Sequence, residues 1–346
     1  MEEKAYKYMV SVRCFTFNQS KYILDALNGF VMQETNFPYV VMVVDDASTD
    51  GEQEVIRKFV TEQFDIADNS VAYKKETDYA HITYAQHKTN KNCFIAVLYL
   101  KENLYSQGRS EEKFKYLSEW RDYVKYEAVC EGDDYWIDAQ KLQKQVDFLE
   151  EHEEYNLCTH RIYRFDQENN IFYKDVFDYK FKNNQGIDIT NRTKVWLAET
   201  SSVLYRRSAH EEYLKYDGMK RDIISIYFVL KSGRGYCFSK PMSVYRQNLG
   251  GVFAKQSVDV KLINGSYKAI KELYNKEKTR DSRFLYYRYY ANTFILTKGR
   301  ILFLEKFNLR KILSLVIFIP SVVFMKHPSY KPITNSVFIS NLKNIK

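Results

Sequence analysis

Three carboxylates stand within four residues of the chain, at Glu131, Asp133 and Asp134. An apolar run, 128–130, precedes them and a helix is predicted over 141–151, so the acids mark the end of a strand before a helix. Like charges this close raise one another's pKa unless a cation lies among them. Their oxygens suit Mg²⁺ or Mn²⁺, which proteins usually hold with one or two carboxylates plus substrate phosphates. The pattern predicts a metal–phosphate site, and a solvated acidic turn that caps the helix is the alternative.

A second strand end, upstream of the first, is also acidic. Residues 39–44 are apolar without interruption, as in a strand buried on both faces of a parallel sheet, and the two acids of 45–46 follow directly. Ser48 or Thr49 can cap the helix expected over 52–64.

The elements that must position these acids alternate along the chain. A first strand is expected over 8–14 and a helix over 21–30, so the chain opens as strand, helix, strand, helix. This order is typical of an α/β domain with a mostly parallel central sheet flanked by helices, and such sheets bind ligands at the carboxyl ends of their strands. Neither a dinucleotide-type nor a P-loop glycine motif follows either strand, so a nucleotide would be held by side chains and metal.

Four motifs follow one another along the chain. They are Val10-Ser11-Val12 with Thr16-Phe17-Asn18, then Val44 to Asp50, then Glu131 to Trp136 with Lys141, Leu142 and Gln145, and finally Arg221-Asp222, 233–235, Val244-Tyr245-Arg246 and 250–252. Together they resemble glycosyltransferase family 2, whose members have the GT-A fold, over residues 8–253. The resemblance implies a Rossmann-like α/β catalytic domain, 1–253, and a C-terminal helical region, 254–346, in which helices are expected over 258–277 and 281–307.

Through this resemblance the first two motifs are assigned to a nucleotide-sugar donor. Phe17 stands where relatives place a Tyr against the nucleotide base, and its ring can stack without the hydroxyl; a core Phe is the alternative. Asp46 matches the carboxylate that accepts hydrogen bonds from the base, usually uracil, whereas Asp45 is interpreted as a helix-capping or structural acid. For two further donor contacts an alternative stays open, a solvated loop at Asn90 and a structural ion pair at Arg246. The full set of expected donor contacts is Thr16, Phe17, Asn18, Asp46, Asn90, Glu131, Asp133 and Arg246.

The resemblance also assigns the acidic motif. Asp133 and Asp134 match the DXD-type pair that meets the ribose and the metal bridging the diphosphate, so a Mn²⁺ or Mg²⁺ cofactor is expected at these two residues. Glu131 occupies the first acid position, and which of the three acids touches the metal stays open. Asn248 stands about where relatives carry a His that approaches the metal or diphosphate, and an amide is a poor metal ligand.

Sugar transfer from such a donor needs two kinds of help. A divalent cation neutralises the leaving diphosphate, and a carboxylate takes the proton of the acceptor hydroxyl. Asp222 is the candidate base, because it opens an apolar helix expected over 223–230 that should partly desolvate it; an N-cap role is the alternative. Family 2 enzymes invert the anomeric centre in one displacement, and the absence of a convincing Ser-His-Asp or Cys-His arrangement is consistent with that.

Composition fits a large enzyme domain. The chain has 346 residues, 45% of them hydrophobic, which is enough for a substantial core. Its five cysteines, at 14, 93, 130, 158 and 237, form no CxxC pair, so neither a zinc site nor a disulfide framework is indicated and a reducing cytoplasm fits best. The opening residues 1–8 are charged and lack the apolar core of a signal peptide.

The C-terminal tail is basic. After Glu305 the sequence contains Lys and Arg but no acid, and fourteen uncharged residues, 312–325, lie between Lys311 and Lys326. The run contains Pro320 and is shorter than the about twenty residues of a spanning helix. It predicts an interfacial or re-entrant anchor on an anionic cytoplasmic leaflet, with a helix packed on the catalytic domain as the alternative. No dense basic patch or recognition motif supports nucleic-acid binding.

These features predict a metal-dependent, inverting GT-A glycosyltransferase on the cytoplasmic face of the membrane. It would move a sugar from a nucleotide-diphosphate donor, expected to be a UDP-sugar, to a hydroxyl of a lipid-linked or surface-polysaccharide acceptor. Two other classes stay open. One is an inactive relative that scaffolds a membrane assembly, which Asn248 favours, and the other is a metal-dependent nucleotidyltransferase, whose usual glycine-rich loop is absent. A glycoside hydrolase would also use two carboxylates but has no need of the nucleotide-side motifs.

Overall fold

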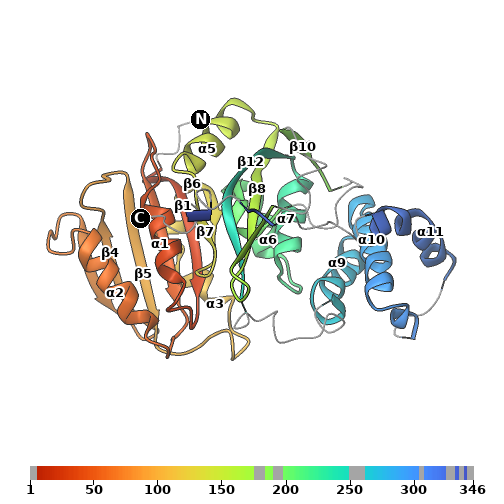
Figure 1. Ribbon diagram of the computed structural model, residues 1–346, viewed down its shortest axis with the longest axis horizontal. Helices are drawn as coiled ribbons and strands as arrows, with labels where there is room; N and C mark the ends of the chain where they lie inside the picture. The colour runs from red at the N-terminus through yellow and green to blue at the C-terminus, as the bar shows by residue number, and fades with distance from the viewer. Residues whose placement is uncertain are drawn as a thin grey trace.

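A single twelve-stranded sheet runs through the part of the chain described by the computed structural model, which covers residues 6–174, 184–189, 198–248, 262–303, 308–324, 332–334 and 339–340. Helices lie against both faces of this sheet, and three more helices form one end of the molecule (Figure 1). The strands are β1 Tyr8–Thr16, β2 Tyr39–Asp45, β3 Ala72–Glu76, β4 Ala80–Gln86, β5 Cys93–Leu100, β6 Val124–Val129, β7 Tyr135–Trp136, β8 Tyr155–Asp166, β9 Ile171–Lys174, β10 Gln185–Ile187, β11 Leu204–Arg206 and β12 Arg234–Gln247.

The centre of the sheet is parallel. Strands β6, β1, β2 and β5 are neighbours in this order and all run the same way. All seven residues of β2 are buried, as its uninterrupted apolar run predicts. The outer strands pair antiparallel, except that β8 and β12 are parallel to each other. The α/β prediction is therefore confirmed, with a mixed sheet whose parallel part is its centre.

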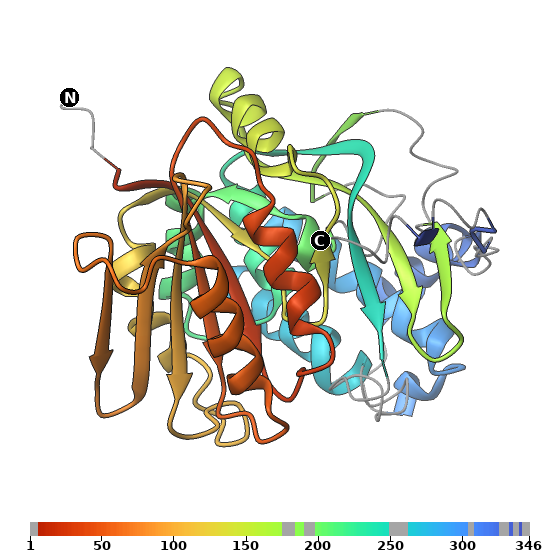
Figure 2. The ribbon, with the colours of Figure 1, turned by 60° about the vertical axis from the view of Figure 1, so that its left-hand side comes forward.

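Helices cover each face of the sheet with a separate apolar cluster. Helices α1, α2 and α5 pack on one face, where β1 contributes Val10, Val12 and Cys14; α1 and α2 lie in front of the sheet in Figure 2. On the other face, the segment with α3 and α4 packs on Val40, Met42 and other residues of β2 and β5. The described helices are α1 Ile23–Val31, α2 Glu52–Gln63, α3 Glu112–Tyr116, α4 Ser118–Arg121, α5 Lys141–Glu151, α6 Glu211–Lys215, α7 Asp222–Lys231, α9 Lys268–Glu277, α10 Arg280–Leu296 and α11 Leu309–Phe324.

The C-terminal helices continue the core of the catalytic part. Ile270 and Leu273 of α9 and Tyr290 of α10 belong to the same hydrophobic cluster as α7 and Leu157 of β8. Helix α11 then packs on α10. The described residues after 253 are thus mostly helical and share a core with the preceding sheet, while Pro332 forms an isolated bridge with Tyr173 of β9.

Several predicted boundaries move. The long helix expected over 281–307 ends at Leu296, because Lys298 and Gly299 adopt left-handed backbone with φ of 50° and 87°, and a short 3₁₀ helix, Arg300–Phe303, follows. The segment before α9, Leu262–Tyr267, is a π-helix, and the rest of the helix expected from 258 lies outside the described residues.

The predicted cap of α2 is also wrong. Its N-cap is Gly51, with φ of 87°, and neither Ser48 nor Thr49 caps the helix. The first helical N–H, that of Glu52, is instead bound by the Asp50 carboxylate at 3.1 Å. An Asp two residues before the helical residue it binds forms a local turn of its own, which competes with a simple hydroxyl cap.

The other predictions about chain segments have mixed outcomes. All five cysteines are buried and free. None of the helices within the described residues has the length and apolar character needed to cross a membrane. The glycine loop at 250–251 and the lysines at 326, 331, 343 and 346 lie outside the described residues.

Candidate active site

Three of the sequence motifs meet at the carboxyl edge of the parallel strands. Thr16 and Asp45 are the last paired residues of β1 and β2, and the Asp46 N–H donates to the Thr16 carbonyl at 3.0 Å. The loop after β6 joins them, because the Gly132 N–H donates to the Phe15 carbonyl at 3.2 Å. This is the edge at which open α/β sheets bind ligands.

The loops after β1 and β2 are tied together by side chains predicted to touch the donor. The Asn18 N–H donates to the Ser48 hydroxyl at 2.9 Å, and the Asn18 side-chain oxygen accepts from the Thr49 N–H at 2.8 Å. The buried Thr16 hydroxyl donates to the Glu52 carboxylate. Thr16 and Asn18 therefore shape the rim, while Phe17 between them is 43% exposed and presents its ring to solvent.

The paired acids after β2 have different surroundings. Asp45 is buried, and one of its oxygens accepts from the Ser48 N–H at 3.1 Å and from the Gln53 side chain at 2.6 Å. These contacts confirm a structural role for Asp45.

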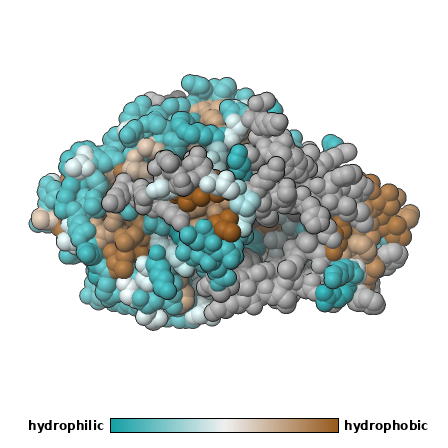
Figure 3. All heavy atoms as spheres, viewed as in Figure 1, coloured by the Kyte–Doolittle hydropathy of each residue, from teal (hydrophilic) through white to brown (hydrophobic). Residues whose placement is uncertain are grey.

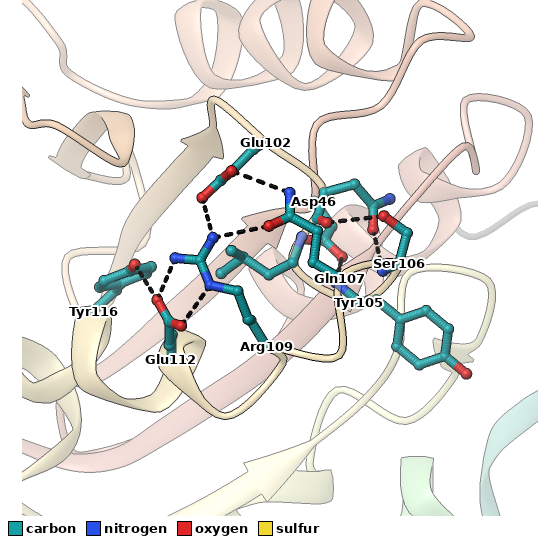
Figure 4. A network of polar contacts seen from close by, with 10 residues as sticks. Asp46, Glu102, Tyr105, Ser106, Gln107, Arg109, Glu112 and Tyr116 are labelled. Atoms are coloured by element: carbon teal, nitrogen blue, oxygen red, sulfur yellow. Dashed lines mark hydrogen bonds and ion pairs between the residues drawn. The ribbon is translucent and has the colours of Figure 1, made fainter.

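Asp46 is held by a loop that the sequence did not connect to it. It is 1% exposed, and its oxygens accept from the N–H groups of Leu104 and Tyr105 at 2.9 and 3.1 Å and from the Lys113 ammonium at 2.8 Å (Figure 4). The protein itself thus supplies three donors to the carboxylate that the sequence assigned to a nucleotide base. A single Lys in a charged segment carries no signal of such a contact, which explains why Lys113 was missed.

The same loop is braced from within. Arg109 pairs with Glu102 and with Glu112, each at 2.6 Å, and donates to Gln107 at 2.8 Å. Figure 4 shows the Tyr105 ring directed away from this network, and the residue is 52% exposed. The loop therefore presents an aromatic ring at the same edge of the sheet as Phe17.

The acidic motif is crowded and partly buried. Burial raises the pKa of Glu131 to about 7, with the nearby charges of Asp222 and Asp133 adding to the effect. Burial likewise raises the pKa of Asp133, and burial together with the charge of Asp133 raises that of Asp134 well above its usual value. Burial is the largest cause of the rise at each of the three carboxylates, and a cation bound among them would favour their charged forms.

Strand β12 holds this motif in place. The Arg246 N–H donates to the Asp134 carboxylate and its Nε to the Asp133 carbonyl, both at 2.9 Å. The Asn248 amide donates to the Asp133 carboxylate at 3.0 Å, so Asn248 lies beside the acidic motif.

Arg246 does not point to a donor. Besides its contact with the acidic motif, its guanidinium forms an ion pair with Asp25 of α1 and donates to the Gln167 side chain at 2.5 Å. Each of its nitrogens is thus engaged by the protein itself. The structure favours the structural ion pair over the predicted contact with the diphosphate.

The acids fit a magnesium-type ion even though they form no complete cage. No group of three or more His, Cys, Asp and Glu able to hold a metal was found within the described ranges. Mg²⁺ and Mn²⁺ sites in phosphate-transferring enzymes need only one or two carboxylates, because substrate phosphates supply the other ligands. Asp133 is the more accessible of the predicted pair, since Asp134 is 3% exposed.

Asp222 is the first residue of α7 and is exposed. The N-cap of this helix is Arg221, with extended backbone and no side-chain capping bond, so the alternative N-cap role of Asp222 is wrong. The predicted desolvation of Asp222 is also not found, because its side chain lies at the open end of the helix. Its charge raises the pKa of Glu131, which places it within electrostatic reach of the acidic motif.

A buried network of hydrogen bonds and one ion pair anchors α7, the helix that begins with Asp222. The His210 ring bonds to the Ser225 hydroxyl at 2.7 Å and to Arg121 at 3.3 Å, and Arg121 pairs with Glu127 at 2.7 Å. Burial lowers the pKa of His210 to about 3, so the ring is neutral. Burial alone would raise the pKa of Glu127, but the charge of Arg121 holds it well below its usual range. The sequence offered no pattern that joins these four distant residues.

Asn90 lies at the wrong edge of the sheet for a donor contact. It precedes β5, whose first residue, Cys93, pairs with Tyr39 at the start of β2. Its amide donates to the Gln33 carbonyl at 2.8 Å and to the Val31 carbonyl at 3.2 Å. These contacts are at the amino ends of the parallel strands, so the predicted role of Asn90 does not fit.

A central parallel sheet with clustered acids at its carboxyl edge, followed by antiparallel strands that return beneath them, defines a glycosyltransferase fold of the GT-A type. Residues 11–98 match the family described as Glycosyl transferase family 2. Over this segment the chain is similar to glycosyltransferase family 2.

Solved structures support the fold. S. aureus TarS, residues 1–349, in complex with UDP-GlcNAc is 17% identical, with a TM-score of 0.55, over 97% of this chain and 90% of that chain. The mannosyltransferase PcManGT from Pyrobaculum calidifontis, in complex with GDP-Man and Mn²⁺, is 13% identical, with a TM-score of 0.53, over 99% and 88% of the two chains.

Sequence relatives are known from mycobacteria. Uncharacterized proteins of Mycobacterium tuberculosis and Mycobacterium bovis are 27% identical over 255 residues, which is 72% of this chain. The matched region spans 62% of the length of these curated relatives.

Proposed function

We propose that this protein is an inverting glycosyltransferase that moves a sugar from a UDP-sugar to a hydroxyl of a lipid-linked or surface-polysaccharide acceptor. The observation that carries the proposal is the meeting of the acidic motif with the ends of β1 and β2, in a chain similar to family 2 over residues 11–98. A uridine donor is favoured because TarS, which has this fold, is solved with both UDP-GlcNAc and UDP.

The donor would lie across the carboxyl edge of the parallel strands. The exposed ring of Phe17 offers a stacking surface for the base. Asp133 and Asp134 would hold a Mn²⁺ or Mg²⁺ ion, which neutralises charge on the leaving diphosphate when it is bound. The Asn248 amide keeps the Asp133 carboxylate oriented for that task.

Asp222 would act as the general base. The acceptor oxygen attacks the anomeric carbon as the bond from that carbon to the diphosphate oxygen breaks, and the hydroxyl proton passes to the Asp222 carboxylate. Because attack and departure occur on opposite faces in one step, the configuration inverts. Exposure of Asp222 at the start of α7 leaves it open to a large acceptor, and the buried His210–Ser225 bond holds the helix behind it.

We place the reaction at the cytoplasmic face of the membrane. The support is the acid-free basic sequence after Glu305 together with the apolar run 312–325. A basic apolar segment of this kind binds the surface of an anionic leaflet, where a lipid-linked acceptor would be presented.

A second candidate is an inactive relative that scaffolds a membrane assembly. Its support is that the Asp46 carboxylate accepts from three donors of the protein and that each nitrogen of the Arg246 guanidinium contacts an oxygen of the protein. Asn248 in place of the usual His points the same way.

Calorimetric titration with UDP and GDP, each with and without Mn²⁺, tests the proposal. Wild type should bind UDP only with Mn²⁺, and Asp133→Asn should lose that binding while the distant, exposed Glu151→Gln keeps it. Failure of folded wild type to bind either nucleotide would count against a transferase.

Asp222→Asn separates the two candidates. It should bind UDP and Mn²⁺ like wild type but lose on the order of 10²–10⁴ in turnover, as expected for a general base. Turnover can be measured as hydrolysis of the UDP-sugar, by detecting the UDP that is released, so the assay does not require the natural acceptor. Metal-dependent binding without any turnover of a panel of UDP-sugars in wild type would favour the scaffold.

A further inference from the structure

Helix α11 has two different faces. On its inner face, Ser314 and Phe318 are buried, and the Phe318 ring meets Phe284 of α10 edge-on with centroids 5.4 Å apart. On its outer face a stripe of large apolar side chains is open to solvent. The outer stripe consists of Leu309, 69% exposed, Ile312, 37%, Leu313, 50%, Val316, 68%, and Ile317, 60%.

The outer stripe is unusual for this protein. Eleven large hydrophobic residues are exposed among the residues described, and six of them lie between Leu302 and Ile317. The five residues of the outer stripe are spaced by three and four residues, which puts them on one side of α11. Figure 3 shows an apolar patch at the end of the molecule where Figure 1 places α11. A contiguous apolar patch of this kind marks an interaction site.

A pocket opens at the amino end of the outer stripe. It has a volume of about 580 Å³, and Leu309 is part of its wall. Tyr274, Tyr287 and Arg310 also line it, and the Arg310 guanidinium is hydrogen-bonded to the Tyr287 hydroxyl. The volume lies in the range of small-ligand sites, and a guanidinium beside Tyr hydroxyls suits a phosphate group.

We propose that the pocket and the outer stripe form one binding surface for an anionic phospholipid. The phosphate of the lipid headgroup lies in the pocket beside Arg310, and the outer stripe rests in the boundary between headgroups and acyl chains. Tyrosines are favoured at that depth because one end of the side chain is apolar and the other is wet. This assigns a specific lipid-binding surface to the membrane location proposed above, and it rests on that location but not on the donor chemistry.

Length and charge favour this orientation. With sixteen residues, α11 is about 24 Å long, less than the about 30 Å of a hydrocarbon core, so it lies in the plane of the membrane. No acidic residue occurs after Glu305. On α11 itself the Arg310 side chain is exposed, whereas Lys311 is buried over the Tyr290 ring. Anionic headgroups attract such a segment. A second copy of the chain would instead bring two basic segments together, which like-charge repulsion opposes.

Vesicle flotation with the full chain tests the proposal. Wild type should float with vesicles of phosphatidylcholine mixed with phosphatidylglycerol, and much less with phosphatidylcholine alone. The stripe variant Leu313→Gln/Val316→Gln adds no charge and should weaken binding by roughly tenfold or more. Leu24→Gln is the matched control, since Leu24 is an exposed leucine, 43% accessible, on α1.

The pocket needs its own variant. Arg310→Gln should reduce binding to the anionic vesicles while leaving the weak binding to neutral vesicles unchanged. Glycerol phosphate should fail to release wild type from vesicles, because the lipid chains contribute through the outer stripe. Release by glycerol phosphate would show a site for free phosphate groups and would overturn the lipid assignment.

Several other results of the flotation experiment would contradict a lipid-binding surface. Absence of wild-type flotation, or equal flotation of the stripe variant and wild type, would overturn the proposal. The proposal would also be overturned if wild type dimerises with rising concentration in sedimentation experiments, binds no vesicles, and loses its dimerisation in the stripe variant. Circular dichroism and Mn²⁺-dependent UDP binding of each variant keep a folding defect, or a failure of the proposed transferase function, apart from a failure of lipid binding.

Discussion

Removing one charge from the acidic motif should stabilise the metal-free protein at high pH. The pKa of Glu131 is about 7, against an ordinary 4.5, because the group is buried and lies near the charges of Asp222 and Asp133. The folded protein therefore binds this proton more tightly than the unfolded chain does. The stability due to this group is complete below the unfolded pKa and is lost as the pH rises through about 7.

The size of the effect follows from the two pKa values of Glu131. One pKa unit corresponds to about 1.4 kcal/mol. The pKa of Glu131 rises from 4.5 to about 7, so full ionisation of this group costs the folded state up to about 3 kcal/mol. This is an upper limit, since Glu131 is partly exposed and water screens its charge. Glu131→Gln should thus raise the unfolding free energy by at most about 3 kcal/mol at high pH, or roughly 4 °C in Tm for a chain of this size.

Urea unfolding in EDTA, followed by Trp fluorescence, measures this difference. Wild type and Glu131→Gln are compared at about pH 4, below the unfolded pKa, where the gain should nearly vanish, and at about pH 8, where it should be largest. Glu151→Gln, at an exposed acid on α5, should show no gain at either pH. Added Mn²⁺ should stabilise wild type more than Glu131→Gln at the higher pH, because the cation binds only the folded acids. Equal gains at both pH values, or no gain at the higher one, would refute the reasoning.

Two further predictions concern the supports of the site. Arg121→Met leaves the buried Glu127 without its closest cation. It should lower the unfolding free energy by about 3 kcal/mol in urea titrations, and the double variant Arg121→Met/Glu127→Gln should recover part of that loss. An unchanged urea midpoint in Arg121→Met would mean that Arg13 alone satisfies Glu127. In Gly132→Ala, the new Cβ would stand 2.4 Å from the Thr16 hydroxyl and 2.5 Å from the Gln19 side-chain oxygen, so the loop after β1 must move and UDP binding should weaken by roughly tenfold. Gly265→Ala, whose Cβ meets nothing within 4 Å, should bind UDP like wild type in the same calorimetric assay.

The local pattern of the sequence was enough to predict the central elements. The continuous apolar run of β2 predicted a strand buried on both faces of a parallel sheet, and the structure confirms this. Helix α5 occupies the predicted residues, Lys141–Glu151. These predictions succeeded because burial on both faces and helical periodicity are properties of a single segment, and each leaves its mark within a dozen residues.

Contacts between distant segments could not be predicted in this way. Asp46 and Lys113 are 67 positions apart in the printed sequence, yet they form a buried ion pair. Arg246 forms an ion pair with Asp25 on α1, and no local pattern in the sequence joins these two residues. Asn90 was placed at the wrong edge because an isolated Asn after a strand does not reveal which end of the sheet that loop adjoins.

The apolar run near the C-terminus also had some properties that the sequence predicted and others that only the structure revealed. Its length and flanking lysines were visible in the sequence and excluded a simple spanning helix, but left open a membrane anchor or a packed helix. In the structure, α11 packs one face on α10 and exposes the other. By itself the sequence determined which residues are apolar and which carry charge. Only the tertiary structure decided which of them meet, because packing selects one face of each helix and one partner for each buried charge from many that the chain could supply.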